Sequence, residues 1–231
     1  MVKLKAVIFG AIGVIAETSD LQRQAFNLAF AEASLDWKWD TETYRRLLSI
    51  NGGQARLREY RDDDADRSDV TDAVIAILHE RKTHFYSALT AAGSLVPRRG
   101  VAELIKTCRD AGVRVALCTS TSLENVEAIK SALGDKLDFD AFESITTIDK
   151  IGSVKPAPDA YLHCLSQLGL AANEVVAIED TPVSMAAAIA AGISVIATPG
   201  AMTDDQDFSD AAMKVDNLAT VTLVQLDAIV S

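Results

Sequence analysis

Short apolar runs rich in β-branched residues alternate with longer helical patterns along most of this chain, and this alternation constrains the fold more than any other feature. Each expected strand after the first is reached through a helix and a loop, which is the interval that a crossover between parallel strands requires. The sequence therefore predicts an α/β fold, a parallel sheet covered by helices on both faces. The expected strands are Ala6–Phe9, Val113–Cys118, Ala141–Ile145, Val175–Ile178 and Ser194–Ala197, and the expected helices are Val101–Ala111, Leu123–Leu133, Pro158–Leu168 and Pro182–Ala191.

The alternation stops between residues 19 and 90, where the pattern becomes helical. Apolar residues recur there in two stretches, Leu21, Ala25, Phe26, Ala29, Phe30 and Ala33 in the first and Ala73, Ile75, Ile77 and Leu78 in the second. We interpret the interval as a helical insertion that covers the carboxyl ends of the strands, where such sheets bind ligands. The domain prediction is an α/β core of residues 1–18 and 90–231 with a helical cap of residues 19–89.

Composition and charge restrict the partners of the chain. Its 231 residues, 49% of them apolar, can bury a core, and a net charge of −11 repels nucleic acids and anionic membranes. We expect a monomer that binds a small molecule, with no nucleic-acid or membrane partner. Three cysteines in apolar surroundings, without CxxC spacing, favour buried thiols in a reducing compartment, and we expect a cytoplasmic protein. These are Cys108, Cys118 and Cys164.

The N-terminal segment allows two interpretations. Lys3 and Lys5, followed by the apolar stretch 6–16, imitate a signal peptide. The same stretch suits a buried strand that runs into a glycine-containing loop, and its apolar run is too short to span a membrane. We favour the strand, because removing it would remove the first strand of the sheet.

Hydroxyl residues lie between the second expected strand and the helix that follows it. Thr119 and Ser120 stand where a hydroxyl and backbone N–H groups meet a helix N-terminus, an arrangement that binds phosphate. The alternative is that the segment only caps the helix through Ser122.

A lysine and an acidic pair follow at other strand ends. Pro156 and Pro158 fix the direction of Lys155, which suits a phosphate ligand or a countercharge to carboxylates, although an ordinary surface lysine is the alternative. Glu179 and Asp180 follow an apolar strand and offer oxygen ligands to Mg²⁺, unless Asp180 merely caps the next helix.

The order of these segments resembles the haloacid dehalogenase (HAD) superfamily of phosphohydrolases, and further segments resemble its CbbY subfamily. The resemblance covers essentially the whole chain and implies a HAD-like Rossmannoid parallel core with an inserted C1-type helical cap. The segments that carry it are Phe9–Val14, Phe30–Ala33, Asp36–Asp40, Tyr44, Leu47, Leu48, Gly52, Gly53, Arg56, Cys118–Ser122, Lys155, Glu179–Asp180 and Thr198–Gly200.

The resemblance also assigns roles to residues of the expected core. In such enzymes one aspartate after the first strand attacks phosphorus and binds Mg²⁺, and a second, two residues later, transfers the proton. Gly10 and Ile12 stand at these positions, so the chain lacks both the nucleophile and the proton donor. The resemblance implies that Thr119, with Ser120 beside it, and Lys155 bind phosphate.

The metal site and the cap pocket depart from the family pattern. The resemblance makes Asp180 a metal ligand with Glu179 beside it, but without a carboxylate at position 10 we expect weak or absent Mg²⁺ binding. Five residues match the cap pocket for xylulose 1,5-bisphosphate, namely Glu17, Tyr44, Gly52, Gly53 and Arg56. Four others differ from the expected residues, namely Gln54, Ala55, Val154 and Ser184.

Two functional hypotheses follow. The first is a non-catalytic protein that binds a small phosphorylated metabolite on a sugar-phosphate phosphatase scaffold. The second is an active phosphatase on a sugar bisphosphate, in which Glu179, Asp180 or Glu17 activates water directly. We favour the first, because no remaining acid occupies the strand-end position from which in-line attack is made.

Two further features indicate no site. The acidic run 62–66 does not fit a calcium loop, because Arg67 and Ala73 stand where glycine and a bidentate glutamate are required, and we expect a solvated loop. The histidines share no metal-ligand spacing and are interpreted as surface or packing residues, namely His79, His84 and His163.

Overall fold

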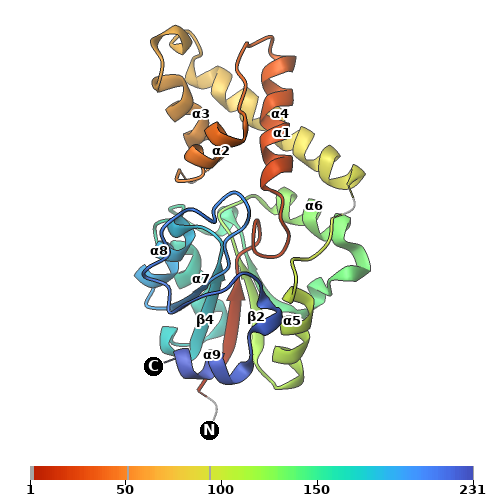
Figure 1. Ribbon diagram of the computed structural model, residues 1–231, viewed down its shortest axis with the longest axis vertical. Coiled ribbons are helices and arrows are strands. Elements are labelled where there is room, and N and C mark those ends of the chain that lie inside the picture. Colours follow the sequence, from red (N-terminus) through yellow and green to blue (C-terminus); the bar gives the residue numbers. More distant parts are fainter. Residues whose placement is uncertain (1–2, 51, 94, 231) are drawn as a thin grey trace.

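A parallel sheet forms the centre of the molecule. The computed structural model describes residues 3–50, 52–93 and 95–230. Within these residues six strands pair in the order β3-β2-β1-β4-β5-β6, and every neighbouring pair is parallel. The strands are β1 (Ala6–Phe9), β2 (Arg114–Cys118), β3 (Phe142–Thr146), β4 (Val175–Glu179), β5 (Ser194–Ala197) and β6 (Met213–Lys214) (Figure 1).

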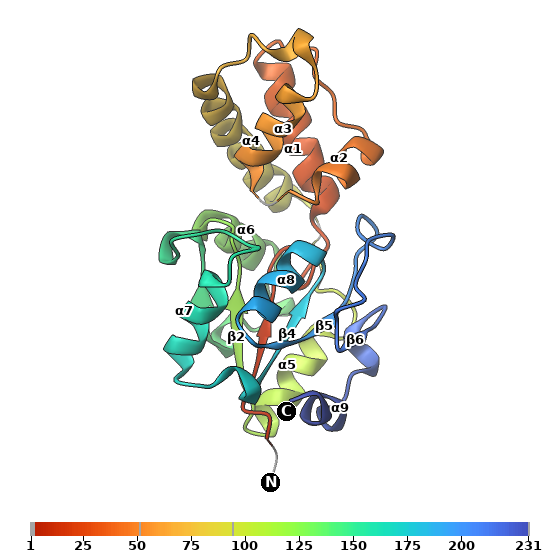
Figure 2. The ribbon, with the colours of Figure 1, turned by 90° about the vertical axis from the view of Figure 1, so that its left-hand side faces the viewer.

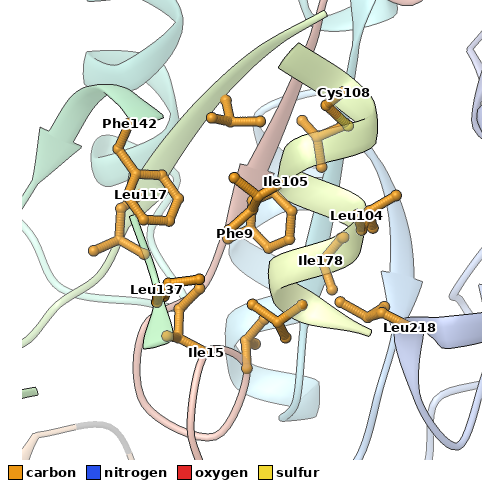
Figure 3. Close-up of a cluster of buried hydrophobic side chains, with 14 of the residues drawn as sticks. Phe9, Ile15, Leu104, Ile105, Cys108, Leu117, Leu137, Phe142, Ile178 and Leu218 are labelled. Carbon is orange, nitrogen blue, oxygen red and sulfur yellow. The ribbon is translucent and has the colours of Figure 1, made fainter. Parts of the chain in front are cut away.

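Helices cover both faces of this sheet. They are α5 (Val101–Asp110), α6 (Leu123–Leu133), α7 (Asp159–Leu168), α8 (Pro182–Ala190) and α9 (Leu223–Ile229). Successive side chains of a strand point to opposite faces, so Phe9 packs with α5 on one face while its neighbour Ile8 packs with α7 and α8 on the other. Figure 3 shows the first cluster, in which Phe9 and Ile178 of the sheet lie against Leu104 and Ile105 of α5. The prediction of an α/β fold with two covered faces is confirmed.

The expected strands agree closely with the structure. Ala6–Phe9 and Ser194–Ala197 have the predicted bounds, and the other three expected strands shift by one residue at one or both ends. The sequence analysis did not predict β6, because two residues show no alternation. The N-terminal stretch is a central strand, since β1 pairs with β2 on one side and with β4 on the other. That placement supports the strand rather than the signal peptide.

A helical layer, defined here as α1–α4, lies over the carboxyl ends of the strands (Figures 1 and 2). It contains α1 (Ser19–Glu32), α2 (Thr41–Leu47), α3 (Gly53–Asp62), the short 3₁₀ turn η1 (Ala65–Arg67) and α4 (Asp72–Ala92). The layer has its own aromatic core, which includes Phe26, Phe30, Trp37, Trp39, Tyr44 and Tyr60. The predicted domain boundary at residues 89 and 90 falls inside α4, and the division into core and cap stays a prediction.

The apolar pattern predicted for α4 was partly wrong. Ile75 and Leu78 are buried as expected, whereas Ile77 is 58% exposed and Ala73 is also exposed. The reason is the period of the helix, because residues two apart lie on nearly opposite sides while residues three or four apart share a face. The buried face of α4 continues instead through Lys82 and Tyr86.

The remaining general expectations concern the cysteines and the acidic run. Cys108, Cys118 and Cys164 are buried free thiols, as predicted. Residues 62–66 are mostly exposed, and Asp64 caps the short turn η1. No helix within the described part of the chain is both long enough and apolar enough to cross a membrane.

Candidate functional site

A cavity of about 480 Å³ is lined by residues of both the sheet edge and the helical layer. Ten of the predicted site residues line it, namely Ile12, Tyr44, Gly52, Gly53, Arg56, Thr119, Ser120, Lys155, Glu179 and Asp180. Gly10 and Glu17 are not among the lining residues. Because parallel strands end at one edge of the sheet, segments far apart in the sequence meet at this cavity.

The hydroxyl segment after β2 is held by its own hydrogen bonds. The Thr119 amide donates to the Thr146 carbonyl at 3.0 Å, and the Thr119 hydroxyl accepts from the Thr121 amide at 3.2 Å. Ser122 caps α6 by accepting from the Asn125 amide at 3.4 Å, so the capping interpretation holds for that residue. It leaves Thr119 and Ser120 in the cavity wall.

Lys155 and Glu179 form a buried ion pair beneath the cavity. Their side chains are 4% and 2% exposed. Lys155 Nζ donates to Glu179 Oε1, and the Tyr161 hydroxyl donates to the same oxygen. Burial alone would lower the pKa of Lys155, but the charge of Glu179 outweighs it and raises that pKa above its ordinary value. The alternative of an ordinary surface lysine is wrong.

Asp180 is buried beside this ion pair. Burial raises the pKa of Asp180 well above its ordinary value, and the charges of Glu179 and Glu17 act in the same direction. Thr181 caps α8 by accepting from the Ser184 amide at 3.2 Å, so the capping interpretation of Asp180 is wrong.

The described residues bring together no group of three or more His, Cys, Asp or Glu side chains able to hold a metal ion. One oxygen of Glu179 is already engaged by Lys155 and Tyr161, which leaves few free carboxylate oxygens for a hard cation. This donor set does not fit a resident Mg²⁺ ion. Weak or absent Mg²⁺ binding at Glu179 and Asp180 stays a prediction.

The loop after β1 is packed tightly against the acidic pair. A Cβ atom added to Gly10 would lie 2.6 Å from Glu179 Oε2 and 2.9 Å from Val14 Cγ2. Gly13 has a φ of +79°, and a Cβ there would lie 1.8 Å from Asp180 Oδ2. A side chain at position 10 therefore competes with the Glu179 carboxylate for the same space.

Arg98 fixes this loop from the segment that returns from α4. Its amide donates to the Ile15 carbonyl at 2.8 Å, and its guanidinium donates to the Gly13 carbonyl. The same guanidinium donates to the carbonyls of Thr198 at 2.6 Å and Pro199 at 2.8 Å. One side chain thus joins three segments at the edge of the site.

Glu17 has a structural environment of its own. It is exposed, and its Oε1 accepts from the Ser19 amide at 3.0 Å. A Cβ added to Gly200 would lie 2.0 Å from Glu17 Oε2, so the glutamate packs against the loop after β5. The structure therefore places Glu17 beside the cavity rather than in its wall.

The helical layer contributes a basic wall to the cavity. Arg56 Nε donates to the carbonyls of Leu47 at 3.1 Å and Ile50 at 2.8 Å. Burial, together with the charge of Arg56, lowers the pKa of Lys82 to about 7. Burial, with the charges of Lys82 and Arg56, lowers the pKa of His79 to about 4. At neutral pH His79 is therefore uncharged.

The sequence analysis missed Gln22, His79 and Lys82, although all three line the cavity. A signal was present at Lys82, because it follows Ile75 and Leu78 at helical spacing on the buried face of α4. A lysine at such a core position is rare unless it has a specific role.

Comparisons with known proteins agree with this architecture. A family model described as haloacid dehalogenase-like hydrolase matches residues 4–192. Protein CbbY of Rhodobacter capsulatus is 42% identical over 217 residues, which cover 94% of this chain and 95% of that protein. Protein CbbY of Cereibacter sphaeroides is 37% identical over 216 residues, which cover 94% and 93%.

Solved structures of CbbY from Rhodobacter sphaeroides also match. One is in complex with phosphate, and another, of a mutant, is in complex with xylulose-(1,5)bisphosphate. Each has a TM-score of 0.86 and 36% sequence identity, and the match covers 94% of this chain and 96% of the solved one.

The buried ion pair predicts a pattern of stability in paired variants. Lys155→Met leaves the Glu179 carboxylate buried without its cation, and we expect the free energy of unfolding to fall by about 3–5 kcal/mol. Adding Glu179→Gln removes the unpaired charge and should recover much of this loss. Urea denaturation of the three proteins measures both values. Equal losses in the single and double variants would contradict the ion-pair explanation.

Lys82 predicts a pH-dependent stability. Its folded-state pKa of about 7 lies below the ordinary 10.5, so charged Lys82 destabilises the fold fully below pH 7, and the penalty falls as the pH rises toward 10.5. Lys82→Met should therefore raise the melting temperature more at pH 6 than at pH 9. Lys106→Met, at a site with a 76% exposed side chain, is the control and should show no such difference.

Proposed function

Because the chain belongs to the haloacid dehalogenase-like hydrolase family, as a homologue of CbbY, we propose that it binds a phosphorylated metabolite in the cavity without aspartate-based phosphoryl transfer. The observation that carries the proposal is the environment of Gly10. No carboxylate is attached there, and Glu179 Oε2 occupies the adjacent space, 2.6 Å from the position of an added Cβ. A covalent phosphoryl intermediate needs a nucleophile at the reacting end of the cavity.

The core side of the cavity suits a phosphate group. Thr119 and Ser120 offer hydroxyls and backbone N–H groups before α6, and Lys155 adds a positive charge. Hydroxyls and amides at a helix N-terminus stabilise an anion through hydrogen bonds and the helix dipole. Without an aspartate at position 10, an incoming phosphate meets less negative charge at this wall.

The opposite wall suits a second anionic group. Neither Arg56 nor Lys82 belongs to an ion pair among the described residues, although the chain carries a net charge of −11. Two cations facing one cavity repel each other until an anion lies between or beside them. This supports a sugar bisphosphate as the ligand, the class to which the xylulose-(1,5)bisphosphate bound by CbbY of Rhodobacter sphaeroides belongs.

We also propose that residues 19–89 act as the cap of this cavity. Arg45 of α2 donates to the Ala201 carbonyl at 2.7 Å and pairs with Asp204 at 2.6 Å and Asp205 at 2.8 Å. These contacts join the helical layer to the loop after β5. They support a closed arrangement in which the layer shields the ligand from solvent.

The alternative is hydrolysis through a remaining carboxylate. Glu179 is held by Lys155 and Tyr161, and Glu17 lies outside the cavity wall. Only Asp180 remains as a cavity carboxylate without an ion-pair partner among the described residues. The geometry therefore favours binding over turnover, and the next experiment separates the two.

A ligand that binds the folded protein alone should raise its melting temperature. At about 100 times the dissociation constant the gain is roughly 2.7 kcal/mol, which for a chain of this length is a shift of roughly 5–10 °C. We expect xylulose 1,5-bisphosphate and inorganic phosphate to stabilise the protein, and Thr119→Val to reduce both shifts. Phosphate release measured with Mg²⁺ should stay at the buffer rate. Release well above that of the Thr119→Val variant would contradict binding without turnover.

Restoring two aspartates tests the assignment of positions 10 and 12. Gly10→Asp with Ile12→Asp should introduce Mg²⁺-dependent phosphate release from xylulose 1,5-bisphosphate, because the pair supplies a nucleophile and a proton donor. Glu179 must yield to the new side chain, which its flexible end allows. Gly10→Asn with Ile12→Asn is the matched uncharged control. The proposal fails if the unmodified protein already turns over as fast as the aspartate variant.

A further inference from the structure

Lys82 is a buried amine inside the helical layer and in the cavity wall. Its residue exposure is 4%, and it lines the same cavity as Thr119 and Lys155. Its Nζ donates to Gln22 Oε1 of α1 and lies 5.1 Å from the ring centroids of both Phe26 and Tyr86. Its neighbours are thus one amide and two aromatic rings, with no ion pair among the described residues.

The surroundings of Lys82 favour its unprotonated form. The titratable and charged groups nearest to it are positive or neutral at pH 7, apart from carboxylates on the core wall. From α2 and α3 these are Tyr44 and Arg56, on α4 itself His79 and Tyr86, and from the core wall Lys155, Glu179 and Asp180. With a pKa of about 7, about half of the Lys82 population is a free amine at pH 7. For an ordinary lysine the free fraction is on the order of 10³ times smaller.

A second group beside Lys82 lacks a partner. Gln22 is 5% exposed, and its amide nitrogen Nε2 has no hydrogen-bond acceptor among the described residues. Gln22 also lines the cavity. A buried amide donor without an acceptor is costly, and an oxygen atom of a ligand would satisfy it. The cavity therefore presents a nucleophilic nitrogen next to an available donor.

We propose that Lys82 forms a reversible imine with an aldehyde or ketone that carries a phosphate group and occupies the cavity. The amine nitrogen attacks the carbonyl carbon, and a C–N bond forms as the C=O π bond opens. The carbinolamine then loses its oxygen as water, which carries away both amine protons and leaves the C=N bond. The step is a condensation and needs no oxidant or reductant.

The partners of this reaction follow from the cavity walls. Gln22 Nε2 is placed to donate to the carbonyl oxygen during attack, and the hydroxyl segment at Thr119 suits the phosphate group. The inference rests on the proposed function only for that phosphate group. The chemistry at Lys82 depends on α1 and α4, and the site is not the one that would attack phosphorus.

Pyridoxal 5′-phosphate and sodium borohydride provide the test, because borohydride reduces an imine to a stable secondary amine. The full chain is incubated with the aldehyde at pH 7 and reduced, and its peptides are analysed by mass spectrometry. We expect Lys82 to be labelled at least tenfold faster than the exposed Lys106, with a rate that is half-maximal near pH 7. Lys82→Met should lose that label and keep the slow labelling of exposed lysines.

Two comparisons separate the parts of the proposal. Pyridoxal, which has no phosphate, should label Lys82 at least tenfold more slowly, and inorganic phosphate should slow labelling by pyridoxal 5′-phosphate. If Lys82 stays unmodified while exposed lysines react, the imine proposal is overturned, whatever the melting-temperature shifts with phosphate show. If Lys82 reacts equally fast with both aldehydes, the requirement for a phosphate group is overturned. Loss of the phosphate-induced shift alone would refute the proposed function instead.

Discussion

The buried ion pair between Lys155 and Glu179 positions most of the candidate site. Two charges removed from water are tolerated only when they face each other and their remaining hydrogen bonds are satisfied, here with the help of Tyr161. The pair ties the segment before α7 to the end of β4, and thereby sets where the carboxylate lies relative to Gly10. The loop after β1 can approach so closely because residue 10 has no side chain.

Much of the fold could be predicted because the sheet is buried on both faces. Strands such as Ala6–Phe9 then consist almost entirely of apolar residues, and helices of regular period separate them. The prediction was weakest where that physics is weak. β6 is only two residues long, and the exposed Ile77 interrupts the buried face of α4 because hydrophobicity alone does not specify helical phase.

The candidate site divides in the same way. Thr119, Lys155 and Asp180 could be placed together from sequence, since the carboxyl ends of parallel strands converge at one edge. The residues of the opposite wall could not, because the position of Lys82 depends on how α1 and α4 pack against each other. The sequence also left open which group pairs with Lys155, since ion pairing at this edge depends on side-chain directions rather than on strand order.

The contacts of Arg98 have a mechanical consequence. The chain leaves the sheet through the loop of Gly13 and Ile15 and returns through Arg98, and direct hydrogen bonds join the two crossings. Two separate linkers would permit shear as well as rotation, but two linkers fastened side by side leave a single pivot. Movement of the helices relative to the sheet is thereby reduced to a swing about one point, like a door on one hinge pin. The residues beyond the pivot can change without altering the register of the strands below it.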